Sequence, residues 1–244
     1  MKGLDVKIKG NFGDLNFDFN HSFLINGITA LFGPIGSGKS TIVNVIGGFN
    51  KKLNATIVLN ENKIQVENFL SPRLRPISIM FQENRLIETL TVHENLEFAV
   101  EKSRKKLCIT KPVDKDKILK DLNLHDKLLK YPKLLSVGEK QLVSLARTLL
   151  ISSEFIILDE PTSSLDLRLK KKVLSFLKNF NKKFRIPILL ISHSVEEISQ
   201  ISDEILLINK GKLEASGKVH EVMIKKEFKN FFGKFESGAI LEGK

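Results

Sequence analysis

Short apolar runs alternate with longer amphipathic stretches along most of this chain. Four continuous apolar runs predict strands buried on both faces of a parallel sheet. These runs cover residues 28–32, 77–81, 155–158 and 188–191. Strict alternation of apolar and polar residues at 4–8 and 15–19 predicts half-exposed antiparallel strands instead. We place the turn between these two strands at 10–13, with Phe12 inside the turn.

The middle of the chain, from about residue 91 to residue 153, has no segment with strand spacing. Apolar residues recur there every three or four positions, as they do along one face of a helix. Two capping boxes, each a Thr or Ser followed three residues later by Glu, predict helix starts at Thr91 and Ser136. Because predicted strands lie on both sides, this stretch is expected to be an all-helical insert in an α/β core.

The remaining segments complete a single predicted domain over residues 1–244. Further elements are expected as a strand at 56–59, helices at 168–182, 196–201 and 219–231, and a hairpin of 205–208 with 213–215. Residues 73–75 are interpreted as a basic loop. A mostly parallel sheet flanked by helices would form from 1–84 and 154–244, with an antiparallel β subdomain at its N-terminal end, and the helical subdomain would span 85–153.

Composition narrows the class of protein. An apolar fraction of 42% is enough for a sizeable core. The single cysteine, Cys108, excludes an intrachain disulfide and fits a reducing compartment. No apolar run approaches the roughly 18 residues of a membrane span. The first five residues lack the apolar region of a secretory signal. We therefore expect a protein that is soluble or peripheral to a membrane.

Net charge is +11, from 39 basic and 28 acidic residues. Such an excess is compatible with binding to nucleic acid or to an anionic membrane surface. However, the lysines stand in short scattered groups rather than in one stripe, which favours ordinary solvated helix faces. A nucleic-acid partner is therefore not expected.

One stretch fits the pattern G-x-x-x-x-G-K-[ST] without a mismatch. It reads Gly33, Pro34, Ile35, Gly36, Ser37, Gly38, Lys39, Ser40 and Thr41. A predicted strand precedes it and a helical pattern follows, which is the arrangement that binds phosphate at a helix N-terminus. Lys39 would then reach the β- and γ-phosphates, and the Ser40 hydroxyl would bind Mg²⁺. We expect a nucleoside triphosphate site.

Two carboxylates, Asp159 and Glu160, end the apolar run at 155–158. Asp159 is expected to hold Mg²⁺, and Glu160 to act as general base toward the attacking water. Gln82 and His193 also follow predicted parallel strands, so they should reach the same edge of the sheet. They fit a role in sensing the γ-phosphate and Mg²⁺, with Gln82 as a further metal ligand.

The order of these motifs resembles that of the ATP-binding cassette (ABC) ATPases, over roughly residues 4–220. Residues 33–41 resemble Walker A, 155–160 Walker B, Gln82 the Q-loop, 135–141 the signature motif, 163–166 the D-loop and His193 the switch histidine. The resemblance implies a P-loop NTPase core, ATP and Mg²⁺ as cofactors, and Glu160, His193 and Gln82 as catalytic residues.

The resemblance also implies that two copies of the chain sandwich ATP. Ser136, Gly138 and Glu139 of the signature would then face the γ-phosphate held by the partner copy, and Asp166 would belong to the D-loop. Val137 stands where the family usually has Gly, and we expect a β-branched residue there to resist a positive φ and to crowd the phosphate. Phe12 resembles the aromatic that stacks on adenine. Its rival, Phe17, has the alternation of a core position.

Four segments look most like the molybdate-importer ATPases: 27–34, 81–86, 91–96 and 236–242. In that family a small oxyanion-binding domain usually follows the last segment, and we expect it to be absent here. An importer subunit would dock through residues 82–96 onto integral-membrane permease subunits, at the cytoplasmic face of the inner membrane, and act indirectly with a periplasmic or extracellular binding protein. The alternatives are an importer for another solute, a soluble ABC protein acting on nucleic acid or ribosomes, and a non-hydrolysing nucleotide-binding regulator.

Overall fold

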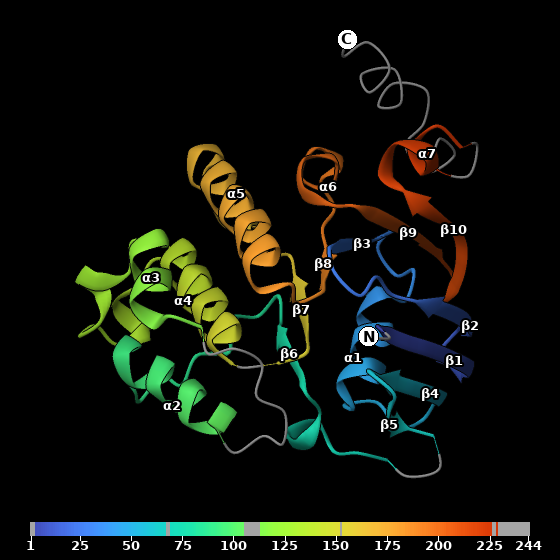
Figure 1. Ribbon diagram of the computed structural model, residues 1–244, viewed down its shortest axis with the longest axis horizontal. Coiled ribbons are helices and arrows are strands. Elements are labelled where there is room, and N and C mark those ends of the chain that lie inside the picture. Colours follow the sequence, from blue (N-terminus) through green and yellow to red (C-terminus); the bar gives the residue numbers. More distant parts are fainter. Residues whose placement is uncertain (1–2, 67–68, 105–112, 152, 226–227, 229–244) are drawn as a thin grey trace.

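A ten-stranded mixed sheet runs through the protein, in the order β5-β4-β1-β2-β10-β9-β3-β8-β7-β6. The structure is a computed structural model that describes residues 3–66, 69–104, 113–151, 153–225 and 228. Cys108 and the segment 236–242 lie outside the described residues. Figure 1 shows the strands β1, β2, β4 and β5 at one side of the molecule and the helices α2, α3 and α4 at the other.

The antiparallel half of the sheet is built from β1 (Leu4–Phe12), β2 (Leu15–Ser22), β4 (Asn54–Leu59) and β5 (Asn62–Gln65). Alternating side chains of β1 and β2 are buried, as their sequence pattern predicts. The predicted turn at 10–13 is wrong, because Phe12 is the last residue of β1 and pairs with Leu15. The strand β5 was not predicted. It closes a tight hairpin in which Asn60 and Glu61 take positive φ angles of 49° and 70°.

The parallel half places five strand ends on one edge of the sheet. It consists of β9 (Glu204–Asn209), β3 (Ile28–Phe32), β8 (Ile188–Ile191), β7 (Phe155–Asp159) and β6 (Ile77–Met80), each parallel to its neighbour. The strand β10 (Lys212–Lys218) pairs antiparallel with β9 and joins the two halves through the parallel pair Lys212 and Asp18. The loops that follow β3, β6, β7 and β8 therefore meet on the side where ligands bind in open α/β sheets.

The regular elements in the described part of residues 85–153 are all helices. They are α2 (Val92–Arg104), α3 (Lys115–Asp121), η2 (His125–Lys127), η3 (Pro132–Leu134) and α4 (Val137–Leu150). Both predicted capping boxes are present: Thr91 and Glu94 exchange hydrogen bonds before α2, and Ser136 and Glu139 do so before α4. Tyr131, 42% exposed, precedes η3. The division at residues 84 and 153 remains a proposal.

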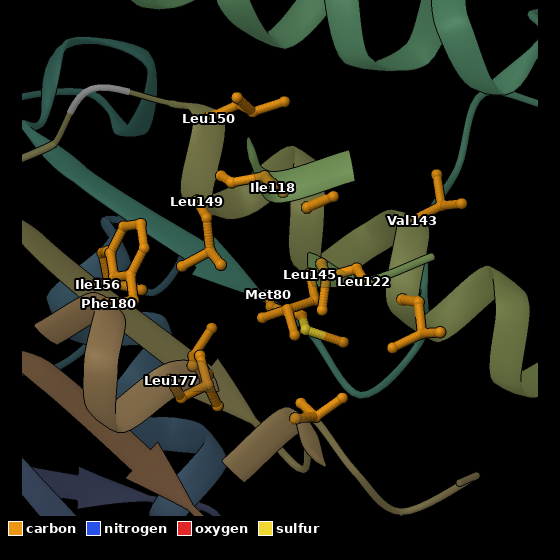
Figure 2. Packing of buried hydrophobic residues seen from close by; sticks show 14 of the residues in the cluster. Met80, Ile118, Leu122, Val143, Leu145, Leu149, Leu150, Ile156, Leu177 and Phe180 are labelled. Carbon is orange, nitrogen blue, oxygen red and sulfur yellow. The ribbon is translucent and has the colours of Figure 1, made fainter. Parts of the chain in front are cut away.

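The other helices pack on the sheet in two layers. One layer is α1 (Lys39–Gly47) against β1, β2 and β4, which share a core with it. On the opposite face lie α5 (Leu167–Phe184) and α6 (Val195–Ile201), and α7 (Val219–Met223) packs beside α6. Figure 2 shows Met80 of β6, Leu145 of α4 and Leu177 of α5 meeting in one hydrophobic cluster. The helical insert therefore shares its core with the sheet.

Arg75 is a buried side chain that the sequence interpretation placed in a basic loop. It follows the short helix η1 (Pro72–Leu74) and is 0% exposed. Its guanidinium donates hydrogen bonds to the carbonyls of Leu70, Val45 and Ile46, at 2.9, 3.0 and 2.6 Å. The last two carbonyls belong to the final turn of α1, so Arg75 caps the helix that follows the phosphate loop. Burial lowers the Arg75 pKa to about 10.

The helix predicted over 219–231 is interrupted, because α7 ends at Met223; residues 226–227 and 229–231 lie outside the described part of the chain. Phe228 is buried and stacks on Phe32, at 5.5 Å between ring centres. Among the described residues no helix has the length and apolar character needed to cross a membrane.

Candidate functional site

The phosphate loop lies where the sequence predicts it, between β3 and α1. The Lys39 ammonium donates hydrogen bonds to the carbonyls of Gly33 and Pro34, at 2.7 and 2.9 Å. Gly38 begins the helix with φ of 103°, and a Cβ there would come within 2.8 Å of the Phe17 ring. A side chain at residue 38 would therefore be strained twice, by backbone conformation and by contact.

Two buried groups in this loop are suited to an anion. Lys39 is only 7% exposed, and burial lowers its pKa while the nearby charges of Asp159 and Glu160 raise it. Within the described residues the buried hydroxyl of Ser37 has no hydrogen-bond partner. Buried polar groups normally have one, so a phosphate oxygen fits this position. Ser40, by contrast, is exposed, as the second residue of α1.

Asp159 ends β7, at the same sheet edge as the loop. Its pKa is raised to about 6, mainly because it is partly buried and secondly because of the Glu160 charge, whereas Lys39 acts in the opposite direction. A carboxylate whose charge is poorly solvated and which lies near a lysine is a suitable ligand for a cation that arrives with its own phosphates.

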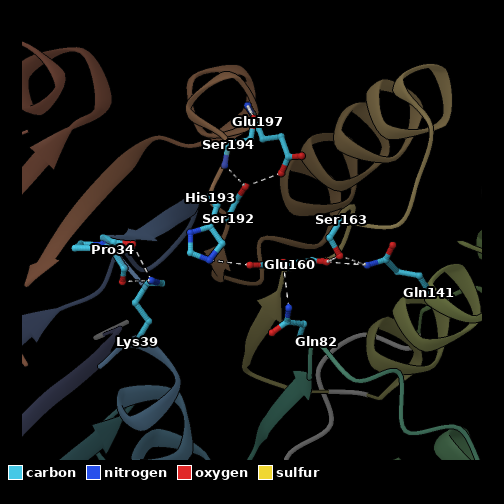
Figure 3. A network of polar contacts seen from close by, with 11 residues as sticks. Pro34, Lys39, Gln82, Gln141, Glu160, Ser163, Ser192, His193, Ser194 and Glu197 are labelled. Carbon is cyan, nitrogen blue, oxygen red and sulfur yellow. Dashed lines mark hydrogen bonds and ion pairs between the residues drawn. The ribbon is translucent and has the colours of Figure 1, made fainter. Parts of the chain in front are cut away.

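The Glu160 side chain is the point where three strand ends meet. One carboxylate oxygen contacts His193 Nε2 at 2.9 Å, and the other accepts a hydrogen bond from Gln82 Nε2 at 3.4 Å. Figure 3 shows Gln82 and His193 approaching Glu160 from neighbouring strand ends. The Glu160 backbone has φ of 50°, and its N–H donates to the Ile191 carbonyl at 2.9 Å. The sequence prediction that Gln82, Glu160 and His193 lie together is confirmed by this geometry.

Gln141 lies in the segment that resembles the signature motif, and no sequence pattern assigns a role to its side chain. It is 1% exposed, and its side-chain nitrogen donates to the Glu160 carbonyl at 2.7 Å and to Ser163 Oγ at 3.1 Å. Its side-chain oxygen accepts from the Ser164 N–H at 2.9 Å. One amide therefore ties α4 to the turn after β7 (Figure 3).

The predicted signature residues lie at the start of α4. Ser136 caps the helix, and Glu139 pairs with Lys127 at 3.0 Å. A Cβ on Gly138 would meet the Ser164 carbonyl at 3.2 Å, so this position is close-packed. The expected backbone strain at Val137 is wrong, because Val137 is the first residue of α4 and is not among the residues with positive φ. Its side chain is 64% exposed.

The side chains of Phe12 and Asp166 make their described contacts away from Glu160. Phe12 is partly buried on the antiparallel sheet, with Lys52 Nζ 5.9 Å from its ring centre, whereas Phe17 is 1% exposed in the core. Asp166 caps α5 by accepting from the Leu169 N–H at 2.9 Å. Of the segments that resemble the signature and the D-loop, Gln141 and Ser163 do bond to the Glu160 carbonyl, at 2.7 and 3.1 Å. Among the described residues, no hydrogen bond or ion pair joins the predicted site residues Phe12, Ser136, Gly138, Glu139 and Asp166 to Lys39, Glu160 or His193.

A family model described as ABC transporter matches residues 13–163, which is more than half of the chain. The chain belongs to the ABC transporter family. One relative is the molybdenum import ATP-binding protein ModC of Pectobacterium atrosepticum, which is 35% identical to this chain over 242 residues. That match covers 98% of the chain and 66% of the relative. ModC of Saccharophagus degradans is 37% identical over 198 residues, which are 81% of the chain and 54% of the relative. The ABC chain thus spans between about half and two thirds of these relatives.

Solved structures agree with the family. A dimeric ATP-binding cassette in a post-hydrolysis state, bound to ADP and Pi, is 25% identical, with a TM-score of 0.73 over 88% of this ABC chain and 98% of the other. A structure described as the ATP binding subunit of an ABC transporter is 22% identical, with a TM-score of 0.76 over 98% of both chains. The second likeness concerns the fold alone.

Metal binding by this chain would require the phosphates of a bound nucleotide as additional ligands. Ser40, Gln82 and Asp159 are the predicted ligands, and only Asp159 carries a charge. No group of three or more His, Cys, Asp or Glu residues suited to a metal occurs in the described part of the chain. Mg²⁺ commonly binds through one or two carboxylates together with substrate phosphates, so this donor set fits Mg²⁺ with ATP.

Proposed function

We propose that this chain is the ATP-binding and ATP-hydrolysing subunit of an ABC importer. The observation that supports this most is the contact of Glu160 with both His193 and Gln82, on the sheet edge that also carries Lys39. A general base, two polar groups that can sense the γ-phosphate, and a phosphate-binding lysine together suit phosphoryl transfer to water.

Each residue then has a distinct task in hydrolysis. Lys39 would exchange its bonds to the Gly33 and Pro34 carbonyls for phosphate oxygens. Glu160 would accept a proton from the attacking water, and His193 would hold the Glu160 carboxylate and the γ-phosphate in register. Mg²⁺ would be held by Ser40, Asp159 and Gln82 and would neutralise charge developing on the phosphates. Phe12 would stack on adenine.

The active form would be a pair of chains with ATP between them. The N-terminus of α4 carries Ser136, Gly138 and Glu139, and a helix N-terminus is a suitable site for an anion. This supports the proposal that these residues contact the γ-phosphate bound by the second copy. Asp166 would lie in the same interface. The dimeric ATP-binding cassette among the similar structures favours this arrangement.

The transport partners would be membrane proteins. We infer docking through residues 82–96 onto permease subunits at the cytoplasmic face of the membrane, with a binding protein acting on the far side. Molybdate or a related oxyanion is the proposed solute, because the molybdenum import ATP-binding proteins are 35% and 37% identical to this chain. The cassette would supply the ATP-driven step rather than bind the solute.

Glu160→Gln tests the mechanism. The variant should bind ATP, lose hydrolysis by at least about 100-fold, and form an ATP-dependent dimer in size-exclusion chromatography. Glu196→Gln is the matched control, because Glu196 is exposed on α6, and it should hydrolyse ATP normally. A variant that stays monomeric with ATP would contradict the sandwich.

Affinity capture from membranes tests the partners. Recovery of a multi-span permease, together with molybdate-dependent ATP hydrolysis by the complex, would support the importer. Recovery of ribosomes or DNA would instead support the nucleic-acid alternative. Nucleotide binding without hydrolysis by the unmutated chain would favour a regulator.

A further inference from the structure

Glu197 is a buried carboxylate that the hydrolysis scheme does not use. It lies in the first turn of α6 and is 4% exposed. One of its oxygens accepts a hydrogen bond from Ser192 Oγ at 2.7 Å, and the other contacts Lys170 Nζ at 2.7 Å. Lys170 belongs to the first turns of α5. Both oxygens of a buried charge are therefore satisfied from two different elements.

Through its contacts with Ser192 and Lys170, Glu197 links the loop that carries His193 to α5. Ser192 Oγ also accepts from the Ser194 N–H at 3.0 Å, and Ser194 Oγ accepts from the Glu197 N–H at 3.3 Å. The residues on both sides of His193 are thus bonded to one another and to Glu197, as Figure 3 shows for Ser192, Ser194 and Glu197. The His193 ring itself is 46% exposed and contacts Glu160. Its position depends on how its neighbours are held.

A small hollow is lined by both the Lys170–Glu197 pair and the Glu160–His193 pair. It has a volume of about 130 Å³ and is lined by residues that include Glu160, Thr162, Lys170, His193 and Glu197. Thr162 is 1% exposed, and its hydroxyl has no hydrogen-bond partner in the described residues. A hollow of this size has room for a few water molecules, each occupying about 30 Å³. Both pairs therefore border the same space.

We propose that Lys170 and Glu197 are positioning residues for His193. Their ion pair fixes the loop 192–194 to α5 and thereby sets the distance between His193 Nε2 and the Glu160 carboxylate. This inference rests on the proposed ATP hydrolysis. A buried ion pair adds little net stability, because desolvation offsets most of the attraction between the charges, whereas it does select one arrangement of the elements that it joins.

A double-mutant cycle on turnover tests the positioning role. Glu197→Gln removes the charge but keeps an oxygen that can accept from the Ser192 hydroxyl. The variant should lower kcat about 10-fold, because His193 is less well positioned. KM for ATP should not change, because the phosphate loop is untouched. In a His193→Ala background the same change should have no further effect. Lys170→Met should behave like Glu197→Gln, and Lys170→Arg should restore kcat. The control Lys171→Met alters an exposed neighbour and should leave kcat unchanged.

The His193 ring signals in an NMR spectrum give a readout independent of catalysis. These signals, assigned by comparison with His193→Ala, should shift in Lys170→Met and Glu197→Gln and return to their original positions in Lys170→Arg. Unchanged signals would overturn the positioning role, whatever the ATPase activity of the unmutated chain. Absence of ATP hydrolysis by the unmutated chain would contradict the proposed function separately. An equal loss of kcat with and without His193 would overturn it as well.

Discussion

The side-chain amide of Gln141 donates a hydrogen bond of 2.7 Å to the backbone carbonyl of Glu160. Gln141→Leu should remove this bond and leave the Ser164 N–H without its acceptor, so the free energy of unfolding should fall by about 2 kcal/mol. ATP turnover should fall too, because the turn that presents Glu160 loses its tie to α4. Urea denaturation and steady-state ATPase assays measure the two effects.

The control for this change is Thr148→Ala. Thr148 is also buried on α4, but among the described residues its hydroxyl donates to a carbonyl of the same helix, that of Ser144. It should lose some stability and keep its turnover. Equal turnover in the two variants would show that Gln141 does not act on Glu160.

Val137→Gly should raise ATP turnover. The Val137 side chain is 64% exposed beside Ser136 and Gly138, where the γ-phosphate of the partner chain is proposed to lie, so removing its methyl groups relieves crowding. Stability should fall by no more than about 1 kcal/mol, because glycine is a poor helix former. Val137→Ala should raise turnover with less loss of stability. The control Ile224→Ala removes an exposed apolar side chain beyond α7. Turnover that does not change in either Val137 variant would show that the valine is tolerated.

Asp159 should make the stability of the nucleotide-free protein depend on pH. Its pKa is about 6 in the folded chain, above the value of about 4 for an unfolded aspartate. Between these values the folded state binds the proton that the unfolded state releases, so this group stabilises folding as pH falls from 7 to 4. Asp159→Asn should therefore be more stable than the unmutated chain at pH 7, and the difference should shrink toward pH 4. Urea titrations at each pH test this. A constant difference would mean that Asp159 has an ordinary pKa.

Arg75→Lys should destabilise the protein by about 3 kcal/mol, although it keeps the charge. Lysine has no planar fork with which to reach the Val45, Ile46 and Leu70 carbonyls together, and its ammonium would be left poorly paired in the core. Arg73→Lys, at an exposed position, should change stability by less than about 0.5 kcal/mol. Similar midpoints of urea denaturation for the two variants would contradict the capping role of Arg75.

Much of the fold follows from apolar runs with clear ends. The strands at 28–32 and 188–191 agree with the prediction residue by residue, because Gly27 and Gly33 bound the first and Pro187 precedes the second. The strand β5 escaped detection because its residues are mostly polar, and it forms through a tight turn and pairing with β4. The single parallel contact that joins β2 to β10 has no signature in the sequence, since it depends on how distant segments fold together.

The site is partly predictable for a geometric reason. Gln82, Glu160 and His193 each follow a parallel strand, and the ends of such strands meet at one edge, so their proximity could be inferred before the structure. Gln141, Lys170 and Glu197 are helical residues whose partners lie on other elements. Their sequence pattern is that of ordinary solvated or core helix positions. The burial of Arg75 cannot be inferred from a local basic pattern, because it depends on contacts with the end of α1.

Tyr131 has a practical consequence that concerns observation rather than catalysis. The chain contains one tyrosine and no tryptophan, and this tyrosine is 42% exposed just before η3 and Ser136. The intrinsic fluorescence of the protein therefore originates at one place, next to the signature helix. An unlabelled sample can report optically on what happens there when a second copy approaches.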